Sequence, residues 1–347
     1  MNRLQRAIRA ARRGRLDLAG YHLRRALGQE RALPPLPSEL SIEPTNACNL
    51  HCPTCPTGSG KMNRAKRMMR LHEFAAIIDQ VRGYVSSVEL WGYGEPFLNP
   101  DLLEMIRYAT TAGMRVRTST NSEFFETAAF CQGVVQSGLQ HLIVCLDGAD
   151  QETLSKFRVG SDFHRILQGL QRLMQARTEL GSPLPIVELQ FILMKHNQHQ
   201  RALIKDIAQE LGVDVFSEKT VGIPFNDPQF EAMVHEFLPD DLSLTRYRLN
   251  AGGKLVLDGL VPNLCHWVNK RSVINSDGTV VPCCYDLYSE FVMGNVFQES
   301  LRTIWKGPRY EALRTQIARD RKSIPMCNGC PVERVAISKK TKLGAGD

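Results

Sequence analysis

The chain has 347 residues, of which 43% are hydrophobic, and carries a formal net charge of +7. This length is sufficient for one large α/β domain with a smaller domain beside it. The N-terminal region contains many arginines but no apolar core of signal-peptide length, and no later run approaches the roughly 20 apolar residues of a membrane span. We therefore expect a cytoplasmic protein, in which clustered cysteines stay reduced and act as metal ligands or catalysts.

Positive charge is concentrated at the N-terminus. Residues 1–31 hold nine arginines against Asp17 and Glu30, whereas the remaining residues balance at 34 basic and 34 acidic side chains. Apolar residues at helical spacing predict two short helices there, broken near Gly14 and Gly20. This composition is typical of a helix that binds a membrane surface or a partner protein, but the segment could also fold onto the rest of the chain. Because the body is neutral, nucleic acid is the least favoured partner.

From about residue 38, strand-like stretches alternate with helical patterns. Three of the helical patterns begin at Leu71, Leu102 and Phe163. The six strand-like stretches are 39–45, 87–91, 114–119, 140–146, 186–194 and 213–217. Strands alternating with helices predict an α/β fold with a parallel sheet, and six such units favour a partial (β/α)6 barrel of the TIM type. A doubly wound sheet is the alternative.

After about residue 220 this alternation is lost. Residues 222–262 are rich in Pro, Asp and Gly and are expected to form loops, and from residue 265 cysteines return around a helical stretch at about 298–319. This pattern predicts a second, smaller domain stapled by metal. The expected organisation is a basic helical extension and linker at 1–37, a barrel at 38–250, a small C-terminal domain at 251–335 and a tail at 336–347.

The first cysteine cluster is Cys48, Cys52 and Cys55, spaced C-x3-C-x2-C. It directly follows the first predicted strand, and barrel active sites are built at the C-terminal ends of strands. Three thiolates can bind three irons of a [4Fe-4S] cube, which leaves the fourth iron open to a substrate or cofactor. A zinc site is less favoured, because it needs four closed ligands and usually uses paired C-x2-C units.

This spacing after the first strand of an αβ barrel resembles the signature of the radical S-adenosylmethionine (SAM) family. The resemblance implies that the amino and carboxylate groups of SAM chelate the open iron. It also implies that one electron cleaves SAM to methionine and a 5′-deoxyadenosyl radical, which abstracts hydrogen from the substrate. The sequence departs from the family at Thr54, where an aromatic residue is common.

Further segments are similar to motifs of the same family, in the same order along the chain. Residues 93–96 (Tyr-Gly-Glu-Pro) resemble its Gly-Gly-Glu-Pro contact to the SAM amino group, and residues 119–121 (Ser-Thr-Asn) resemble a ribose-side contact. Residues 144–148 are similar to its Ser-Leu-Asp-Gly segment, with Cys145 in place of serine. Arg158 matches an arginine that pairs with the SAM carboxylate. The SAM contacts implied in this way are Gly94, Glu95, Pro96, Ser119, Asn121 and Arg158.

The second cysteine set resembles a shortened form of the SPASM-type domain, which carries auxiliary [4Fe-4S] clusters. The full domain has seven cysteines for two clusters, so one auxiliary cluster is expected here, as in the "twitch" domain of aminocyclitol dehydrogenases. The implied ligands are Cys265, Cys283, Cys327 and Cys330. The interval from Gly278 favours Cys283 over its neighbour Cys284, although spacing alone does not decide between them. A zinc staple on the same thiolates is the alternative.

The resemblance implies a radical SAM enzyme, most simply an oxidoreductase in which the auxiliary cluster accepts the substrate's second electron. The alternatives are a RiPP-type peptide maturase, a non-redox epimerase or dehydratase, and a metal-stapled interaction module without activity. The substrate is a small molecule or a peptide, and the sequence does not assign catalytic residues, because substrate-facing loops vary. The expected partners are an electron donor such as a flavodoxin or ferredoxin and, through residues 1–31, a membrane surface or a protein.

Overall fold

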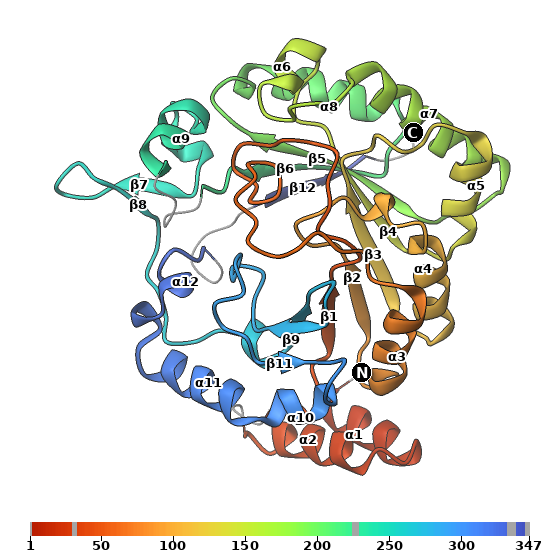
Figure 1. Cartoon of the computed structure of the whole chain (residues 1–347), viewed down its shortest axis with the longest axis vertical. Helices are drawn as coiled ribbons and strands as arrows, with labels where there is room; N and C mark the ends of the chain where they lie inside the picture. The colour runs from red at the N-terminus through yellow and green to blue at the C-terminus, as the bar shows by residue number, and fades with distance from the viewer. Residues whose placement is uncertain (1, 30–32, 224–228, 332–337, 344–347) are drawn as a thin grey trace.

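The computed structural model describes residues 2–29, 33–223, 229–331 and 338–343. Six parallel strands lie side by side in sequence order: β1 (Glu39–Ile42), β2 (Ser87–Leu90), β3 (Arg115–Thr120), β4 (His141–Cys145), β5 (Ile186–Leu193) and β6 (Val215–Thr220). Each overlaps one of the six predicted stretches. The sequential order is that of a barrel wall, whereas a doubly wound sheet reverses its order beside the first strand. The predicted partial barrel is therefore confirmed (Figure 1).

Helices cover the outer side of this sheet (Figure 1). They are α3 (Leu71–Val81), α4 (Leu102–Thr111), α5 (Ala128–Gln136), α6 (Gln151–Ser155), α7 (Phe163–Glu179) and α8 (Arg201–Glu210). The longest, α7, is preceded by Asp162, whose side chain caps the helix by accepting from the backbone N–H of Arg165. Its residues Ile166, Leu170 and Leu173 repeat at helical spacing and are almost fully buried in the main core.

The inner side of the sheet carries charged side chains instead. On β5, the apolar residues Leu189 and Phe191 alternate with Glu188, and all three are fully buried. A buried charge is tolerated only with a partner. Glu188 accepts a hydrogen bond from Lys340, and Glu89 on β2 forms ion pairs with Arg117 and Arg271. The barrel interior is thus built to hold polar groups.

The C-terminal region continues the same sheet at both edges. β9 (Arg271–Ile274) pairs in parallel with β1, so that Arg271 lies opposite Glu39. β10 (Thr279–Val281) and β11 (Gly294–Asn295) follow in antiparallel arrangement. At the opposite edge, β12 (Ser338–Lys342), part of the segment expected to be a tail, pairs antiparallel with β6. The barrel and the C-terminal region therefore share one sheet of ten strands.

Other C-terminal elements partly match the prediction. The helical stretch expected at about 298–319 contains α10 (Leu301–Lys306) and α11 (Pro308–Asp320), and α12 (Pro325–Asn328) follows. Residues 222–262, expected to be loops, contain α9 (Phe230–Phe237) and a hairpin of β7 (Tyr247–Leu249) and β8 (Leu255–Leu257). These elements contribute to a small second core around Phe237 and Tyr247.

Two helices precede the sheet, as predicted: α1 (Arg3–Arg12) and α2 (Leu16–Ala26). The chain breaks at Gly14, whose positive φ of 70° suits glycine. The second predicted break is wrong, because Gly20 lies inside α2. Within the described ranges, no helix combines the length and apolarity that crossing a bilayer requires.

Candidate functional site

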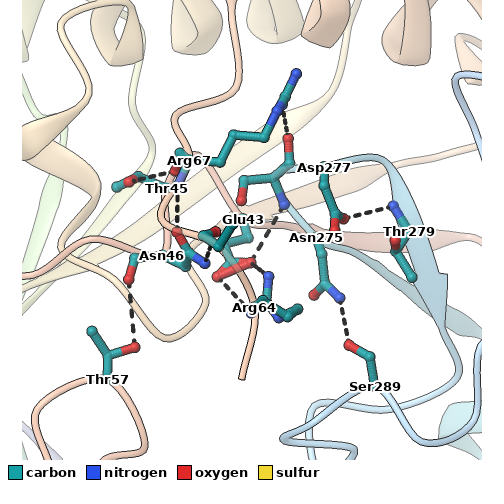
Figure 2. Close-up of polar contacts among 12 residues, drawn as sticks. Glu43, Thr45, Asn46, Thr57, Arg64, Arg67, Asn275, Asp277, Thr279 and Ser289 are labelled. Carbon is teal, nitrogen blue, oxygen red and sulfur yellow. Dashed lines mark hydrogen bonds and ion pairs between the residues drawn. The ribbon is translucent and has the colours of Figure 1, made fainter. Parts of the chain in front are cut away.

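The first cysteine cluster lies on the loop that follows β1. Cys52 is buried and Cys48 and Cys55 are half-buried, and none of them forms a disulfide. The loop is closed by Asn46, whose side chain donates to the carbonyl of Ala65 (2.9 Å) and accepts from the backbone N–H of Arg67 (2.8 Å). Figure 2 shows Asn46 and Arg67 side by side at the base of this loop.

The three thiols of this loop lie near one another. Burial raises the pKa of Cys52 to about 11; the charge of Arg158 opposes this rise, and the nearby Cys55 and Cys48 add to it. Burial likewise raises the pKa of Cys48, with a further contribution from Cys55. Metal would ionise these thiols by coordination. Three soft sulfur donors on one loop fit a [4Fe-4S] cluster with one open iron.

No three His, Cys, Asp or Glu side chains in the described ranges converge as they would around a single metal ion. A four-iron cube holds each thiolate at a separate corner, so it does not require that convergence.

The segment after β2 packs directly on the cysteine loop. A side chain at Gly94 would lie 2.6 Å from the carbonyl oxygen of Ala47 and closer still to that of Thr45, so only glycine fits. The backbone N–H of Glu95 donates to the same Ala47 carbonyl (2.8 Å). Pro96 is buried at the start of the short 3-10 helix η1 (Pro96–Leu98).

Glu95 joins the ends of β2 and β3. Its carboxylate accepts hydrogen bonds from the N–H of Asn121 (2.7 Å), the hydroxyl of Thr120 (2.9 Å) and the N–H of Phe97 (3.1 Å). Burial raises the pKa of Glu95 to about 7, although these donors and Arg158 oppose the rise. The Asn121 amide also donates to the side chain of Asn49 on the cysteine loop (2.8 Å). The predicted residues Glu95 and Asn121 therefore meet beside the cysteines.

The remaining predicted SAM contacts are Ser119 on β3 and Arg158, which follows α6. Arg158 pairs with the buried Asp147 (2.6 Å), which also accepts from the N–H of Ile192 (2.7 Å). Burial opposes the charge of Arg158, but Asp147 outweighs it and raises the pKa of the guanidinium. Ser119 lies 3.7 Å from the thiol of Cys145. An oriented guanidinium beside the cysteine loop can bind a carboxylate.

The second cysteine set gathers around Arg321. This side chain is almost fully buried, and although burial opposes its charge, the thiols of Cys265, Cys330 and Cys327 raise its pKa. Burial raises the pKa of Cys327 to about 11, and Cys283 and Cys265 contribute to the rise. Cys283 therefore lies near Cys265 and Cys327, and four thiols gathered in this way would fit a closed cluster.

Cys284 lies against Cys283, because a hydrogen bond between the two side chains raises the pKa of Cys283, and it also contacts residues outside the second cysteine set. Its backbone carbonyl accepts a hydrogen bond from Tyr93, and its thiol influences the pKa of Lys219. Lys219 lies on β6 opposite Ile192, and burial lowers its pKa, while the thiols of Cys145 and Cys284 act in the opposite direction. Sequence reasoning missed Lys219, because a single lysine in a short strand carries no distinguishing pattern.

A polar contact joins the two cysteine-bearing regions (Figure 2). Arg64 donates two hydrogen bonds to Glu43 (2.6 and 3.0 Å), which also accepts from the N–H of Ser276 (3.4 Å). Arg67 donates to the Ser276 carbonyl, and Asn63 donates to the carbonyl of Tyr288 (3.1 Å). We call these six residues the clasp. One feature of the sequence indicates this contact, because an acidic residue, Glu43, directly follows β1.

Comparison with known proteins agrees with this geometry. Residues 42–188 match the family described as the radical SAM superfamily, and residues 265–331 match the iron–sulfur cluster-binding domain SPASM. The chain is 30% identical over 177 residues to an AdoMet-dependent heme synthase of Methanosarcina barkeri, covering 51% of this chain and 48% of that protein. It thus spans about half the length of that relative.

Two further relatives are covered more fully. The tungsten-containing aldehyde ferredoxin oxidoreductase cofactor-modifying protein of Pyrococcus furiosus is 24% identical, over 79% of this chain and 82% of its own length. The mycofactocin maturase MftC of Mycobacterium ulcerans is 25% identical, over 84% and 79%. The structure of Streptococcus suis SuiB bound to precursor peptide SuiA superposes with a TM-score of 0.63, at 17% identity, over 87% of this chain and 72% of SuiB. At that identity the likeness concerns the fold alone.

Proposed function

Because this chain belongs to the radical SAM superfamily and carries a SPASM iron–sulfur domain, we propose that it is an oxidoreductase using SAM and one auxiliary cluster. When bound, the first cluster supplies the electron that cleaves SAM to methionine and a 5′-deoxyadenosyl radical, and the auxiliary cluster supplies an acceptor for the substrate's second electron. The proposed ligands are Cys48, Cys52 and Cys55 for the first cluster and Cys265, Cys283, Cys327 and Cys330 for the second.

The chain's own residues would bind and orient SAM. Gly94 lets the backbone of 94–96 lie against the cysteine loop, where it can accept from the SAM amino group. Arg158, which pairs with Asp147, would bind the SAM carboxylate, and Asn121, which donates to Asn49 on the cysteine loop, would contact the ribose side. Burial of this region excludes water from the radical.

One observation carries the oxidative proposal: the loop bearing Cys283 lies directly against the region of the first cysteine loop. Tyr93, beside the proposed SAM contacts, donates to the Cys284 carbonyl, and Asn63 donates to the Tyr288 carbonyl (3.1 Å). This contact favours electron transfer from a substrate held between the two sites. A closed four-thiolate cluster also has no free position for ligating substrate.

The first test is formation of 5′-deoxyadenosine from SAM by anaerobically reconstituted protein with a strong reductant. Wild type should form it, and the variant with Cys48, Cys52 and Cys55 all changed to Ala should not. Absence of product from wild type, or its persistence in the variant, would contradict the assignment. In the cell we propose a low-potential electron donor such as a flavodoxin or ferredoxin in the cytoplasm.

The second test separates redox from non-redox chemistry once a substrate is known. Cys327→Ala or Cys330→Ala should retain SAM cleavage and transfer of deuterium from substrate to 5′-deoxyadenosine, but should lose the oxidised product. Full product from either variant would mean that the auxiliary cluster is structural, and epimerisation or dehydration would then be the better assignment.

A peptide substrate is the second candidate, and the relatives favour it. One is named a mycofactocin maturase, and SuiB was solved with a precursor peptide. Short peptides encoded next to the gene are the substrates to test. A crosslinked or oxidised peptide would lose two hydrogens by mass spectrometry, whereas an epimerised one would keep its mass.

A further inference from the structure

The N-terminal hairpin of α1 and α2 is a charged surface that the proposed reaction does not use. Residues 2–29 contain eight arginines and a single acidic residue, Asp17. Asp17 already pairs with Arg302 of α10 (2.7 Å) and accepts from the hydroxyl of Tyr84 (3.2 Å). The positive charge of the hairpin is therefore not balanced by acidic residues of its own.

The hairpin is fixed to the body through one helix. Besides the Asp17 contacts, the guanidinium of Arg15 lies over the ring of Tyr84, 5.5 Å from its centroid. Figure 1 shows α1 and α2 at one end of the molecule, next to α10 and away from the loop that carries the first cysteines. The expectation that this segment folds onto the chain's own barrel therefore accounts for the docking of α2. It does not explain why apolar side chains of the hairpin are exposed on its outer side.

Apolar and small residues are distributed unusually on this hairpin. The buried residues of α1 are Ala7 and Ala10, whereas Leu4 and Ile8 are 52% and 47% exposed. Leu23 of α2 and Leu27, which directly follows this helix, are 46% and 72% exposed. A helical hairpin adapted only to water would turn its leucines inward.

Three of these exposed apolar residues lie at one end of the hairpin, and the fourth lies close to that end. Arg3 donates to the backbone carbonyl of Arg25 (2.9 Å), which places the start of α1 beside the end of α2. Leu4 thus lies at the same end of the hairpin as Leu23 and Leu27, and Ile8 follows one turn further along α1. Exposed arginines lie beside Ile8 toward the other end of α1, where Arg9, Arg12 and Arg13 line one hollow with it.

We infer that this outer side of the hairpin is a docking surface for a bilayer rich in anionic lipid. The leucine and isoleucine side chains would enter the boundary between headgroups and acyl chains, while the arginines bind lipid phosphates. The phosphates of a nucleic acid would bind the arginines, but they would make no favourable contact with four exposed aliphatic side chains. The body, with 34 basic and 34 acidic residues outside 1–31, adds no general polyanion-binding surface.

The test uses the full-length protein and vesicle flotation. With vesicles of about one third phosphatidylglycerol at low salt, wild type should float at least about tenfold more than with pure phosphatidylcholine, and about 0.5 M salt should weaken the effect. Leu4→Ser/Ile8→Ser should abolish flotation at unchanged charge, and Arg9→Gln/Arg12→Gln/Arg13→Gln should reduce it about tenfold.

The body provides matched controls. Leu203→Ser changes an equally exposed leucine on α8, and Lys205→Gln/Arg319→Gln/Lys322→Gln removes the same charge from exposed positions elsewhere. Both should float like wild type. Wild type that ignores anionic vesicles at low salt would overturn the inference. The inference would also be overturned if the Leu4→Ser/Ile8→Ser variant floated normally and duplex DNA displaced it from the vesicles. That result would indicate a surface for nucleic acid.

A second measurement on the wild type tests the inference even if a variant fails to fold its hairpin. Hydrogen exchange of α1 amides in wild type should slow when anionic vesicles are added, and unchanged exchange would also overturn the inference. Neither readout involves SAM, so a failure here is distinct from a failure of the proposed reaction.

Discussion

Gly94 shows how closely the site depends on single atoms. Any β-carbon there would press on the Thr45 and Ala47 carbonyls, both belonging to backbone that cannot yield as a side chain would. We predict that Gly94→Ala displaces the cysteine loop, so that cluster loading at Cys48, Cys52 and Cys55 falls and SAM cleavage drops at least about tenfold. Gly133→Ala is the control, because its β-carbon would meet only Leu103 at 3.4 Å in a helix. Iron content and 5′-deoxyadenosine yield measure the effect, and normal values for Gly94→Ala would refute it.

Glu43 and Arg64 form the buried ion pair of the clasp. Their side chains are only 1% and 10% exposed, so removing one charge leaves the other buried without a partner of opposite charge. Glu43→Gln should lower the free energy of unfolding by about 3 kcal/mol, and adding Arg64→Met should recover part of that loss. In the exposed pair of Arg107 and Glu104, Glu104→Gln should cost less than about 0.5 kcal/mol. Denaturant unfolding of all four proteins gives the comparison; a double variant no better than Glu43→Gln would exclude this explanation.

At the scale of elements, β12 depends on a buried carboxylate of β5. Burial alone would raise the pKa of Glu188, but hydrogen bonds from His141 and Lys340 lower it to about 2. Since the ordinary value is 4.5, this contact stabilises the fold fully above pH 4.5 and loses its contribution as the pH falls toward 2.

Lys340→Met should therefore destabilise the protein by about 1 to 2 kcal/mol at pH 7, because the lysine is half-exposed and only part of the shift depends on it. The difference from wild type should shrink between pH 4.5 and 2. Unfolding curves over this range measure it, with Lys342→Met on the same strand as the control. A difference that does not vary with pH would point to lost packing instead.

Elements also show what the sequence could predict. The six barrel strands could be predicted because apolar runs alternate with helical patterns. Gly94, Glu95 and Asn121 were singled out because their segments resemble motifs of the family, and the structure brings them together beside the cysteine loop. The strand β12 was missed, since Ser-Lys-Lys-Thr-Lys has no apolar pattern and its pairing depends on Glu188, far away in sequence. The hairpin of β7 and β8 was missed for a similar reason, because a three-residue strand is too short to show alternation.

At the scale of the whole molecule, two cysteine sets predict two clusters, and we expect about eight irons per chain after reconstitution. Changing Cys48, Cys52 and Cys55 together to Ala should leave about four irons and an auxiliary spectroscopic signal, because the second set gathers around Arg321 in a different part of the chain. Iron analysis and electron paramagnetic resonance test this. About four irons with bound zinc in wild type would eliminate the second cluster.

The position of β1 between β2 and β9 has a consequence for how the protein is made. Glu39 on β1 and Arg271 on β9 are partners separated by 232 positions in the sequence. Because a ribosome adds about 5 to 20 residues per second, Arg271 is synthesised roughly 10 to 50 seconds after Glu39. During that time β1 keeps an open edge, onto which other chains can add a strand. Nascent chains of this protein should therefore depend on chaperones that shield exposed edges, and soluble yield should rise when such chaperones are co-expressed.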